Sequence, residues 1–226
     1  IGSIDSAGSV NTDAGFSIVS YTGTGSTGTV AHGLGVAPSM LIYKNRASTD
    51  SWNVQHDGLT SYDYYVRLNS TGAQNNDIDV GPTAPTSTVV TVGSHAQQNG
   101  DGNAMILYAF AEKKGYSKIG SYTGNNNANG TFVYTGFKPA YVMTKVTDTT
   151  DGWMIFDNKR NPHNVMDKYM TANGTGADST RNSIDFVSNG FKLRVANTDC
   201  NNGTYIYMAF AEQPFVTSTG VPATAR

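Results

Sequence analysis

The chain has 226 residues, of which only 14% are charged, and its formal net charge is −2. A protein that binds DNA or RNA presents a basic face, so this composition excludes nucleic acid as a partner. The single cysteine, Cys200, excludes an internal disulfide, and no apolar run approaches the roughly 20 residues of a membrane-spanning helix. The remaining surface is rich in Asn, Gly, Ser and Thr, which is typical of extracellular and sugar-facing β proteins.

In the first half of the chain, residues 1–14 are rich in Gly, Ser and Asp and predict a linker. Beyond it, short runs in which apolar and polar residues alternate predict β-strands, because successive side chains of a strand point to opposite faces. No segment shows a convincing helical period. The predicted strands are 16–22, 39–44, 52–56, 64–68, 89–92 and 105–110.

The second half predicts a matching series of strands, and residues 216–226 predict an extended tail. Asn-Gly pairs that begin at positions 99, 129, 173, 189 and 202 indicate tight turns, because both residue types tolerate a positive φ. Short strands separated by such turns are typical of an all-β sandwich or barrel. The predicted strands are 117–123, 141–145, 153–156, 169–171, 184–187, 191–195 and 205–210.

The two halves are copies of one another. The tetrapeptide Ser-Tyr-Thr-Gly at 20–23 returns at 121–124, an offset of 101 residues (121 − 20). A repeat of this length is a whole domain. We therefore expect an all-β fold of two tandem, jelly-roll-like β-sandwich modules: copy one over 15–114 and copy two over 115–215, packed closely because no linker separates them. Residues kept in both copies are interpreted as structural, and the pairs are Pro38 and Pro139, Trp52 and Trp153, and Phe110 and Phe210.

Aromatic residues supply the candidate binding groups. Trp52 and Trp153 are expected in the two cores, because an aliphatic residue follows each at a spacing of two and shares its sheet face. The alternative is that these tryptophans form platforms on which sugar rings stack. The candidate ligand-binding residues are Tyr62, Tyr64 and Tyr65 with the nearby His56, a cluster that copy two lacks.

The sequence signals for catalytic and metal-binding groups are weaker than those for aromatic binding groups. His32 and His56 occur in copy one only, and His32 is interpreted as a strand-end residue that bonds the backbone before a turn. The carboxylate pairs 57/63, 77/79 and 148/151 all lie in turn-like surroundings, where Asp is expected anyway. The run 99–103 is rich in oxygen ligands but lacks the spacing of a calcium loop, so it predicts a hairpin turn. We expect no enzyme activity, no metal and no cofactor.

The segments 15–19, 20–23, 32–38 and 40–45 of copy one, with 136–140, 185–194 and 205–212 of copy two, carry a further signal. In these segments the chain resembles a duplicated domain at the C-terminal end of structural proteins of bacteriophages, especially marine phages. The resemblance covers 15–215, and it brings no catalytic residues with it. It implies a virion context, in a tail fibre, a tail spike or another appendage.

The resemblance and the composition together predict a C-terminal module of a phage appendage that serves assembly and attachment to a host-surface glycan or receptor. Its other expected partners are virion proteins and further copies of itself, with a trimer favoured. Its expected location is the mature virion, after assembly in the host cytoplasm. Two alternatives remain open: a capsid decoration or structural head protein without a ligand, and a carbohydrate-binding or depolymerase fragment.

Overall fold

The computed structural model describes residues 2–81 and 83–212, so the tail expected over 216–226 lies outside the described residues. The chain divides into two compact units. Unit 1 comprises Ile1–Asn69 and Gln74–Glu112. Unit 2 comprises Ser70–Ala73 together with the chain from Lys113 onward. Copy one therefore contributes a short segment to the unit that copy two builds.

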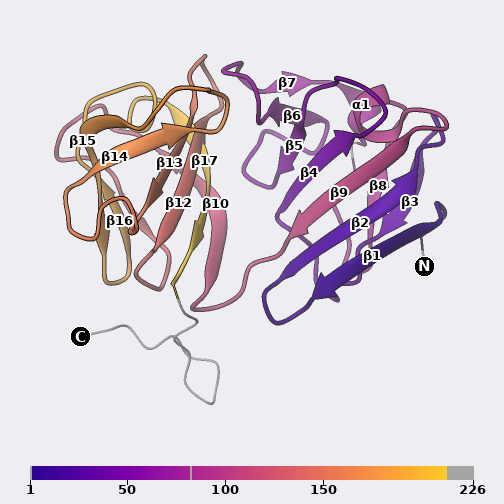
Figure 1. Cartoon of the computed structure of the whole chain (residues 1–226), viewed down its shortest axis with the longest axis horizontal. Helices are drawn as coiled ribbons and strands as arrows, with labels where there is room; N and C mark the ends of the chain where they lie inside the picture. The colour runs from indigo at the N-terminus through magenta and orange to yellow at the C-terminus, as the bar shows by residue number, and fades with distance from the viewer. Residues whose placement is uncertain (1, 82, 213–226) are drawn as a thin grey trace. The chain divides into compact units, whose positions relative to one another are not determined.

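Unit 1 contains two antiparallel sheets with a core between them (Figure 1). The larger sheet has the strand order β1-β2-β9-β4-β5-β6-β7, and β3 pairs with β8 in the smaller one. Buried Val30 and Val90 of the small sheet belong to the same apolar cluster as Leu41 and Leu107 of the large one. The strands are β1 (Ser6–Asn11), β2 (Phe16–Thr22), β3 (Gly28–Ala31), β4 (Met40–Asn45), β5 (Asn53–His56), β6 (Tyr64–Arg67), β7 (Asn75–Asn76), β8 (Val89–Val92) and β9 (Ala104–Phe110).

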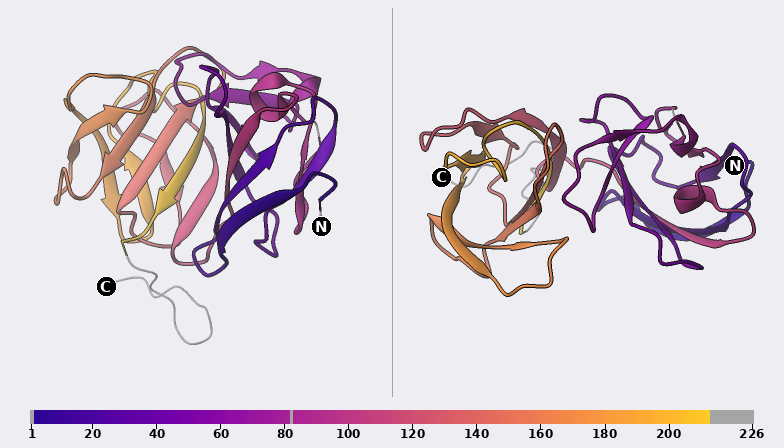
Figure 2. Two further views of the ribbon diagram at one scale, coloured as in Figure 1. Left: turned by 45° about the vertical axis from the view of Figure 1, so that its right-hand side comes forward. Right: turned by 90° about the horizontal axis from the view of Figure 1, so that it is seen from above.

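Unit 2 contains one eight-stranded antiparallel sheet in the order β10-β17-β12-β13-β14-β15-β16-β11. The sheet curls around its core into a nearly closed barrel (Figure 2). The core is aromatic: Phe156, Phe191 and Tyr205 are all buried in it. The strands are β10 (Ser117–Thr123), β11 (Phe132–Tyr134), β12 (Tyr141–Val146), β13 (Trp153–Asp157), β14 (Met166–Thr171), β15 (Ser179–Val187), β16 (Gly190–Leu193) and β17 (Thr204–Phe210).

The strand order confirms the duplication. The run β2-β9-β4-β5-β6 of unit 1 corresponds to β10-β17-β12-β13-β14 of unit 2. The registers agree as well, because Tyr43 pairs with Leu107 and Asn53, and its counterpart Thr144 pairs with Tyr207 and Met154. As expected from their continuous apolar sequences, β9 and β17 each pair with a strand on both sides.

The copies differ where copy two has a long strand. The nine-residue β15 pairs with both β14 and β16 and so joins the two layers into one sheet. At the corresponding place copy one has the two-residue β7 and a 3-10 turn, Ile78–Val80, and its layers stay separate. The one α-helix among the described residues, α1, is a single turn, Ala96–Asn99, which agrees with the expected near absence of helix.

The segment expected as a linker, 1–14, instead contains β1, which pairs along its whole length with β2. Its six residues are all exposed, so the apolar alternation that marks a half-buried strand is missing there. Ile4, also in this segment, is buried in the core of unit 1. Strands β3, β7 and β11 were not expected either, and each has four residues or fewer.

The interiors of the two units differ in polarity. Three buried inner positions of unit 1 carry side-chain amides where unit 2 carries apolar side chains. The amides add the cost of desolvating polar groups to the folding of unit 1 alone. The corresponding pairs are Asn45 and Val146, Asn53 and Met154, and Gln55 and Phe156.

Candidate functional site

A shallow groove lies on the outer face of the large sheet of unit 1. Strands β4 and β9 place alternate side chains on this face, because successive residues of a strand point to opposite sides. The loop between β4 and β5 closes the groove on one side. The groove has a volume of about 300 Å³. We call it the Trp52 groove, and it is lined by Lys44, Asn45, Arg46, Ser48, Trp52, Ile106 and Tyr108.

Two aromatic rings form the floor of the Trp52 groove. The rings of Trp52 and Tyr108 are stacked, with centroids 6.1 Å apart and planes inclined by 27°. The main-chain N–H of Trp52 donates to Oδ1 of Asn69 over 3.1 Å, which fixes the start of β5. Trp52, expected in the core, is half-buried, and its ring lies on the outer face of the sheet against Tyr108.

Lys44 supplies the cationic group of the groove. Its Nζ donates to the main-chain oxygens of Asn45, at 2.6 Å, and Ser48, at 2.9 Å. An ammonium group has three N–H donors, so these two bonds leave one donor for a further acceptor. Arg46, which is exposed, adds a second positive charge at the rim.

The corresponding position of unit 2 holds a piece of main chain. Lys145 Nζ donates to its neighbour Val146 at 2.7 Å, as Lys44 does to Asn45, and also to the main-chain oxygen of Thr71 at 3.2 Å. The same oxygen accepts the N–H of Asp151 over 3.0 Å. The position that is a groove in unit 1 is therefore bound to the Ser70–Ala73 segment in unit 2.

Exposure separates the two copies at this position. Lys145 is 0% exposed and Trp153 is 1% exposed. Their counterparts Lys44 and Trp52 are half-buried. The same contrast holds on the strand beside them, where Ile206 and Met208 are buried but Ile106 and Tyr108 are half-buried. One site of the duplicated pair is covered and the other is open.

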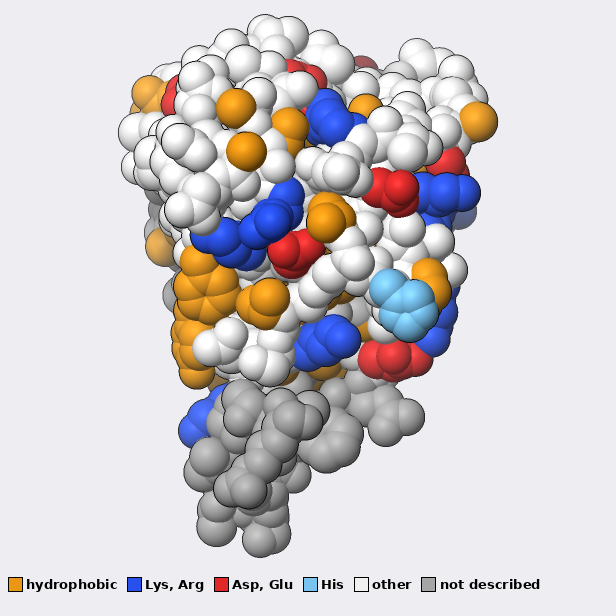
Figure 3. Space-filling view, turned by 90° about the vertical axis from the view of Figure 1, so that its left-hand side faces the viewer, with side chains coloured by type: hydrophobic (Ala, Val, Ile, Leu, Met, Phe, Trp, Pro, Cys, Tyr) orange, Lys and Arg blue, Asp and Glu red, His pale blue; other side chains and the backbone are white. Residues whose placement is uncertain are grey.

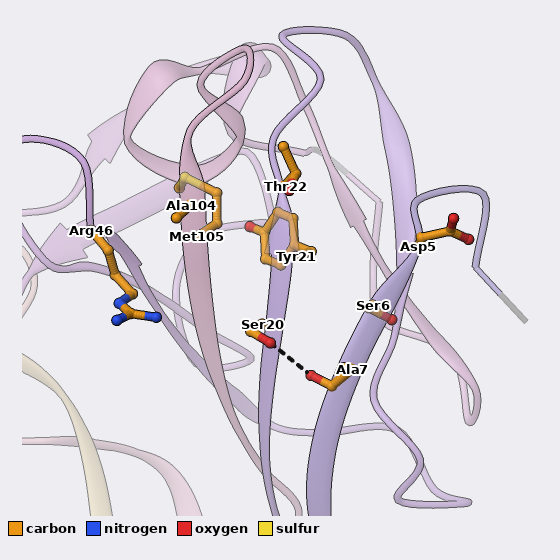
Figure 4. A pocket seen from close by; sticks show the side chains of 9 residues that line it. All are labelled: Asp5, Ser6, Ala7, Ser20, Tyr21, Thr22, Arg46, Ala104 and Met105. Atoms are coloured by element: carbon orange, nitrogen blue, oxygen red, sulfur yellow. Dashed lines mark hydrogen bonds between the residues drawn. The ribbon is translucent and has the colours of Figure 1, made fainter.

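A second depression lies beside the Trp52 groove, over β1, β2 and β9, and has a volume of about 450 Å³ (Figure 4). Arg46 lines both. Ser20 Oγ donates to the main-chain oxygen of Ala7 over 3.1 Å, so this hydroxyl is already bonded within the sheet. The depression is lined by Asp5, Ser6, Ala7, Ser20, Tyr21, Thr22, Arg46, Ala104 and Met105.

The predicted ligand-binding residues are not brought together on one surface. Tyr62 and Tyr64 are half-buried, whereas Tyr65 and His56 are 5% and 2% exposed. Tyr65 points into unit 1, where the centroids of its ring and the His95 ring are 5.9 Å apart. The guanidinium carbon of Arg67 lies over the Tyr65 ring, 5.3 Å from its centroid. The burial of Tyr65 and His56 does not fit a direct contact with a surface ligand.

Tyr62 lies in the turn before β6 and Tyr64 is the first residue of that strand, and the backbone of both is well held. The main-chain oxygen of Tyr62 accepts a hydrogen bond from Nε2 of Gln55, and the N–H of Tyr64 donates to Ser61 over 3.1 Å. Burial raises the pKa of the Tyr62 phenol to about 12, with a further contribution from the negative charge of Asp57. The phenol is therefore neutral at physiological pH and can donate a hydrogen bond.

The histidines and carboxylates have local structural roles. His32 Nδ1 accepts the N–H of Leu34 over 3.2 Å, and Nε2 lies 3.2 Å from the oxygen of Thr86, which confirms its strand-end role. Burial lowers the pKa of His32. His56 Nδ1 accepts the N–H of Gly58 over 2.9 Å in the same way.

Carboxylates bind turn N–H groups: Asp77 accepts from Asp79 over 3.0 Å, and Asp148 accepts from Thr204 over 2.8 Å. Within residues 2–81 and 83–212, no three His, Cys, Asp or Glu side chains lie together as a metal site would require. None of the helices in this part of the chain has the length and apolarity needed to cross a membrane.

The surface agrees with the neutral composition. The face of unit 2 drawn in Figure 3 is mostly white, the colour of uncharged polar side chains and backbone, with blue and red groups scattered over it. Lysine and arginine do not gather into a continuous patch on this face. Binding through such a surface depends on hydrogen bonds and stacking more than on net charge.

The fold and the groove together define a duplicated all-β protein with one copy of a shared outer-face site left open. The chain belongs to the family described as Domain of unknown function (DUF7483), whose model matches residues 1–214. Comparison with curated proteins gave no match. Comparison with solved structures gave none either.

Proposed function

We propose that this chain is a structural module of a phage virion appendage, such as a tail fibre or spike, which serves assembly and attachment to the host surface. The observation that carries the proposal is the unequal exposure of the two equivalent sites. Trp153 and Lys145 are buried, and Lys145 binds the Ser70–Ala73 segment, while Trp52 and Lys44 remain accessible. An open site whose counterpart binds protein main chain suits a subunit of an assembly.

The proposal assigns the module a binding role and no catalysis. Its support is that His32, His56, Asp77 and Asp148 accept backbone N–H groups, and that the groove carries stacked rings and two cationic side chains. Homo-oligomers, with a trimer favoured, and a virion location are parts of the same proposal. So is the finer fold description as jelly-roll-like sandwiches: the two-layer core of unit 1 supports it, whereas unit 2 is one sheet curled into a nearly closed barrel.

Attachment to a host glycan is assigned to Tyr62 and Tyr64, at the turn that leads into β6. Sugars offer hydroxyl groups and apolar ring faces, which neutral tyrosines match by hydrogen bonding and stacking. Around these tyrosines, Asp63 is held by Ser61 and by Nδ2 of Asn76 at 2.7 Å, so polar partners are already ordered there.

Labelling of intact virions tests the proposal. An antibody raised against the purified chain is bound to phage particles and located by electron microscopy. Label at the tail tip or along a fibre is the expected result. Label distributed over the whole shell supports a decoration protein instead, and absence of label from purified virions contradicts a virion role altogether.

A further inference from the structure

The segment that binds unit 2 has a counterpart in copy two. The N–H of Trp52 donates to Asn69, and the N–H of Trp153 donates to Asn173 over 2.8 Å. One residue earlier, the N–H of Leu68 donates to Trp52 and that of Ala172 to Trp153. Residues 69–73 therefore correspond to residues 173–177. The two sequences are Asn69-Ser70-Thr71-Gly72-Ala73 and Asn173-Gly174-Thr175-Gly176-Ala177, which differ at one position.

The two loops have different surroundings. Thr71 accepts two hydrogen bonds from unit 2, one from Lys145 and one from Asp151. In contrast, residues 174–177 are all exposed, and a Cβ built on Gly176 would meet no atom within 4 Å. Within the part of the chain that the structure describes, no hydrogen bond is made by Thr175. Each chain thus presents two unmatched surfaces. One is the open Trp52 groove. The other is the exposed 173–177 loop, whose counterpart 70–73 is bound at the equivalent position of unit 2.

We infer that the 173–177 loop of one molecule binds the Trp52 groove of a second copy of this chain, in the way that residues 70–73 bind unit 2. The main-chain oxygen of Thr175 would accept the remaining N–H of Lys44, as that of Thr71 accepts from Lys145. Asp50, the counterpart of Asp151, would donate its N–H to the same oxygen. Among the residues that the structure describes, that N–H makes one long bond, 3.4 Å, to Ser48 Oγ.

Charges at the two surfaces fit this partner. Arg46 lines the groove where copy two has the neutral Thr147. Asp178, whose carboxylate pairs with Arg160 of its own unit, follows the copy-two loop where the neutral Gln74 follows the copy-one loop. Opposite charges thus occur on the two surfaces expected to meet between molecules, whereas the corresponding residues of the other groove and the other loop are neutral. Complementary charges of this kind favour correct partners over wrong ones.

The contact joins different surfaces of two identical chains, so it is heterologous and generates a ring or a filament. A closed ring of three chains satisfies every groove and every loop and agrees with the expected trimer. A five-residue loop buries too little area for a stable interface, which needs roughly 1,200 Å² or more. The half-buried apolar residues Ile106 and Tyr108 in the groove and Ile18 on the neighbouring strand β2 are the surface that would supply the rest.

Cysteine crosslinking tests the pairing directly. Ser48→Cys places a thiol in the groove and Thr175→Cys places one in the loop; the native Cys200 is buried, so it does not compete. A mixture of the two variants, treated with a short bis-maleimide, is expected to give a covalent dimer, while each variant alone and the wild-type chain stay monomeric on denaturing gels. The double variant is expected to give a ladder that stops at the ring size. Arg46→Cys repeats the test from a second groove position.

Gly176→Trp provides the blocking variant, because the open space around Gly176 accommodates a side chain in the monomer. It is expected to reduce the mass measured by light scattering to that of one chain, without a change in melting temperature. Ser188→Trp, in an exposed turn of unit 2, is the matched control and is expected to leave the mass unchanged.

Three outcomes overturn the inference: a monomer at every concentration, crosslinks formed by Ser48→Cys alone, or crosslinking unaffected by Gly176→Trp. Loss of host-cell adsorption in Trp52→Ala with no change in mass would assign the groove to a glycan instead. The inference rests on the proposed function only in treating the groove as a protein-binding site. Crosslinking in a chain that is absent from virions would therefore refute the proposed function and leave the inference standing.

Discussion

Nδ2 of Asn201 donates to the main-chain oxygen of Val195 over 2.7 Å. Asn99 makes the equivalent bond in unit 1, to Gly93 over 2.8 Å. Both side chains are buried. Asn201 connects the segment after β16 to the loop after β10, and Asn99 connects the segment after β8 to the loop after β2. The bonds to that loop are Asn201 to Asn125 and Asn127, and Asn99 to Thr24 and Ser26.

Asn201→Ala is expected to lower the free energy of unfolding by about 3 kcal/mol, because it leaves buried carbonyl and N–H groups without partners. Asn99→Ala should have a similar effect on unit 1. Urea unfolding followed by fluorescence measures both. Asn201→Asp is the control: it keeps the acceptor oxygen and loses the two donors, so it should also destabilise. A wild-type midpoint for the alanine variants would show that the amides are dispensable.

Exchanging corresponding residues between the two copies should change the stability of the two units differently, because unit 1 carries amides in its interior where unit 2 carries apolar side chains. Both amide atoms of Asn53 and the hydroxyl of Tyr43 are buried and have no hydrogen-bond partner within the described residues. Asn53→Met, which inserts the copy-two residue, is expected to be neutral or stabilising. Met154→Asn, the reverse exchange, is expected to cost about 2–4 kcal/mol, because it puts an amide into an apolar core. Equal destabilisation by the two exchanges, measured by urea unfolding, would contradict this account.

The two tryptophans should differ in their contribution to stability. Trp153→Ala is expected to cost about 3–5 kcal/mol, the range for removal of a large buried aromatic side chain. Trp52→Ala should cost clearly less, because that side chain is only partly buried. Differential scanning calorimetry of the two variants gives the comparison. A larger loss for Trp52→Ala would mean that the outer face of unit 1 contributes more to folding than its exposure indicates.

Lys145 makes the stability of unit 2 depend on pH. Burial lowers the pKa of its ammonium from 10.5 to about 8, against the opposing effect of Asp151 and Asp148. Between these two values the unfolded chain holds a proton that the folded chain has released, so the free energy of unfolding rises with pH. The rise should be about 2 kcal/mol between about pH 7 and 9.5. Above about pH 10, tyrosines with raised pKa values, Tyr141 among them, reverse the trend.

Lys145→Met should remove this rise, although it also removes the bonds to Thr71 and Val146. The slope with pH is the diagnostic quantity, and urea unfolding midpoints at several pH values provide it. Lys44→Met in unit 1 is the matched control. A slope unchanged in Lys145→Met would assign the pH dependence to another group.

Attachment to host cells should depend on Tyr62 and Tyr64. Replacing both by Ala is expected to reduce adsorption to host cells while the far-ultraviolet spectrum and the melting temperature stay close to those of the wild type. Adsorption should change little between low and moderate salt, because charge steering is a minor contribution for a neutral surface. Adsorption that is intact in the double variant, or that falls steeply with salt, would place attachment elsewhere.

Much of the fold follows from the sequence. Long alternating runs such as Phe16–Thr22 and Ser117–Thr123 gave strands with the expected bounds, because one face of each is buried. Strand β1 was missed, since a fully exposed edge strand has no apolar period to reveal it. Trp52 and Trp153 occupy the same place in the repeat, so sequence alone assigned them the same burial. Their difference in exposure depends on which segment covers each, and that is a tertiary property.

The loop match was also present in the sequence, but at an offset of 104 residues (173 − 69), which differs from the 101 of the main repeat. An insertion in copy two hides it from a search at one fixed period. Only the equivalent bonds from Trp52 to Asn69 and from Trp153 to Asn173 align the two loops.

The two loops are under different evolutionary constraints. A change in residues 69–73 has to keep the main-chain oxygen of Thr71 within reach of Lys145 and Asp151 of the same polypeptide, so both sides of that contact lie in one folded chain. A change in residues 173–177 would have to suit a groove on another molecule, which carries the identical change. Related sequences should therefore show two separate sets of covarying positions: 69–73 with 145–153, and 173–177 with 44–52.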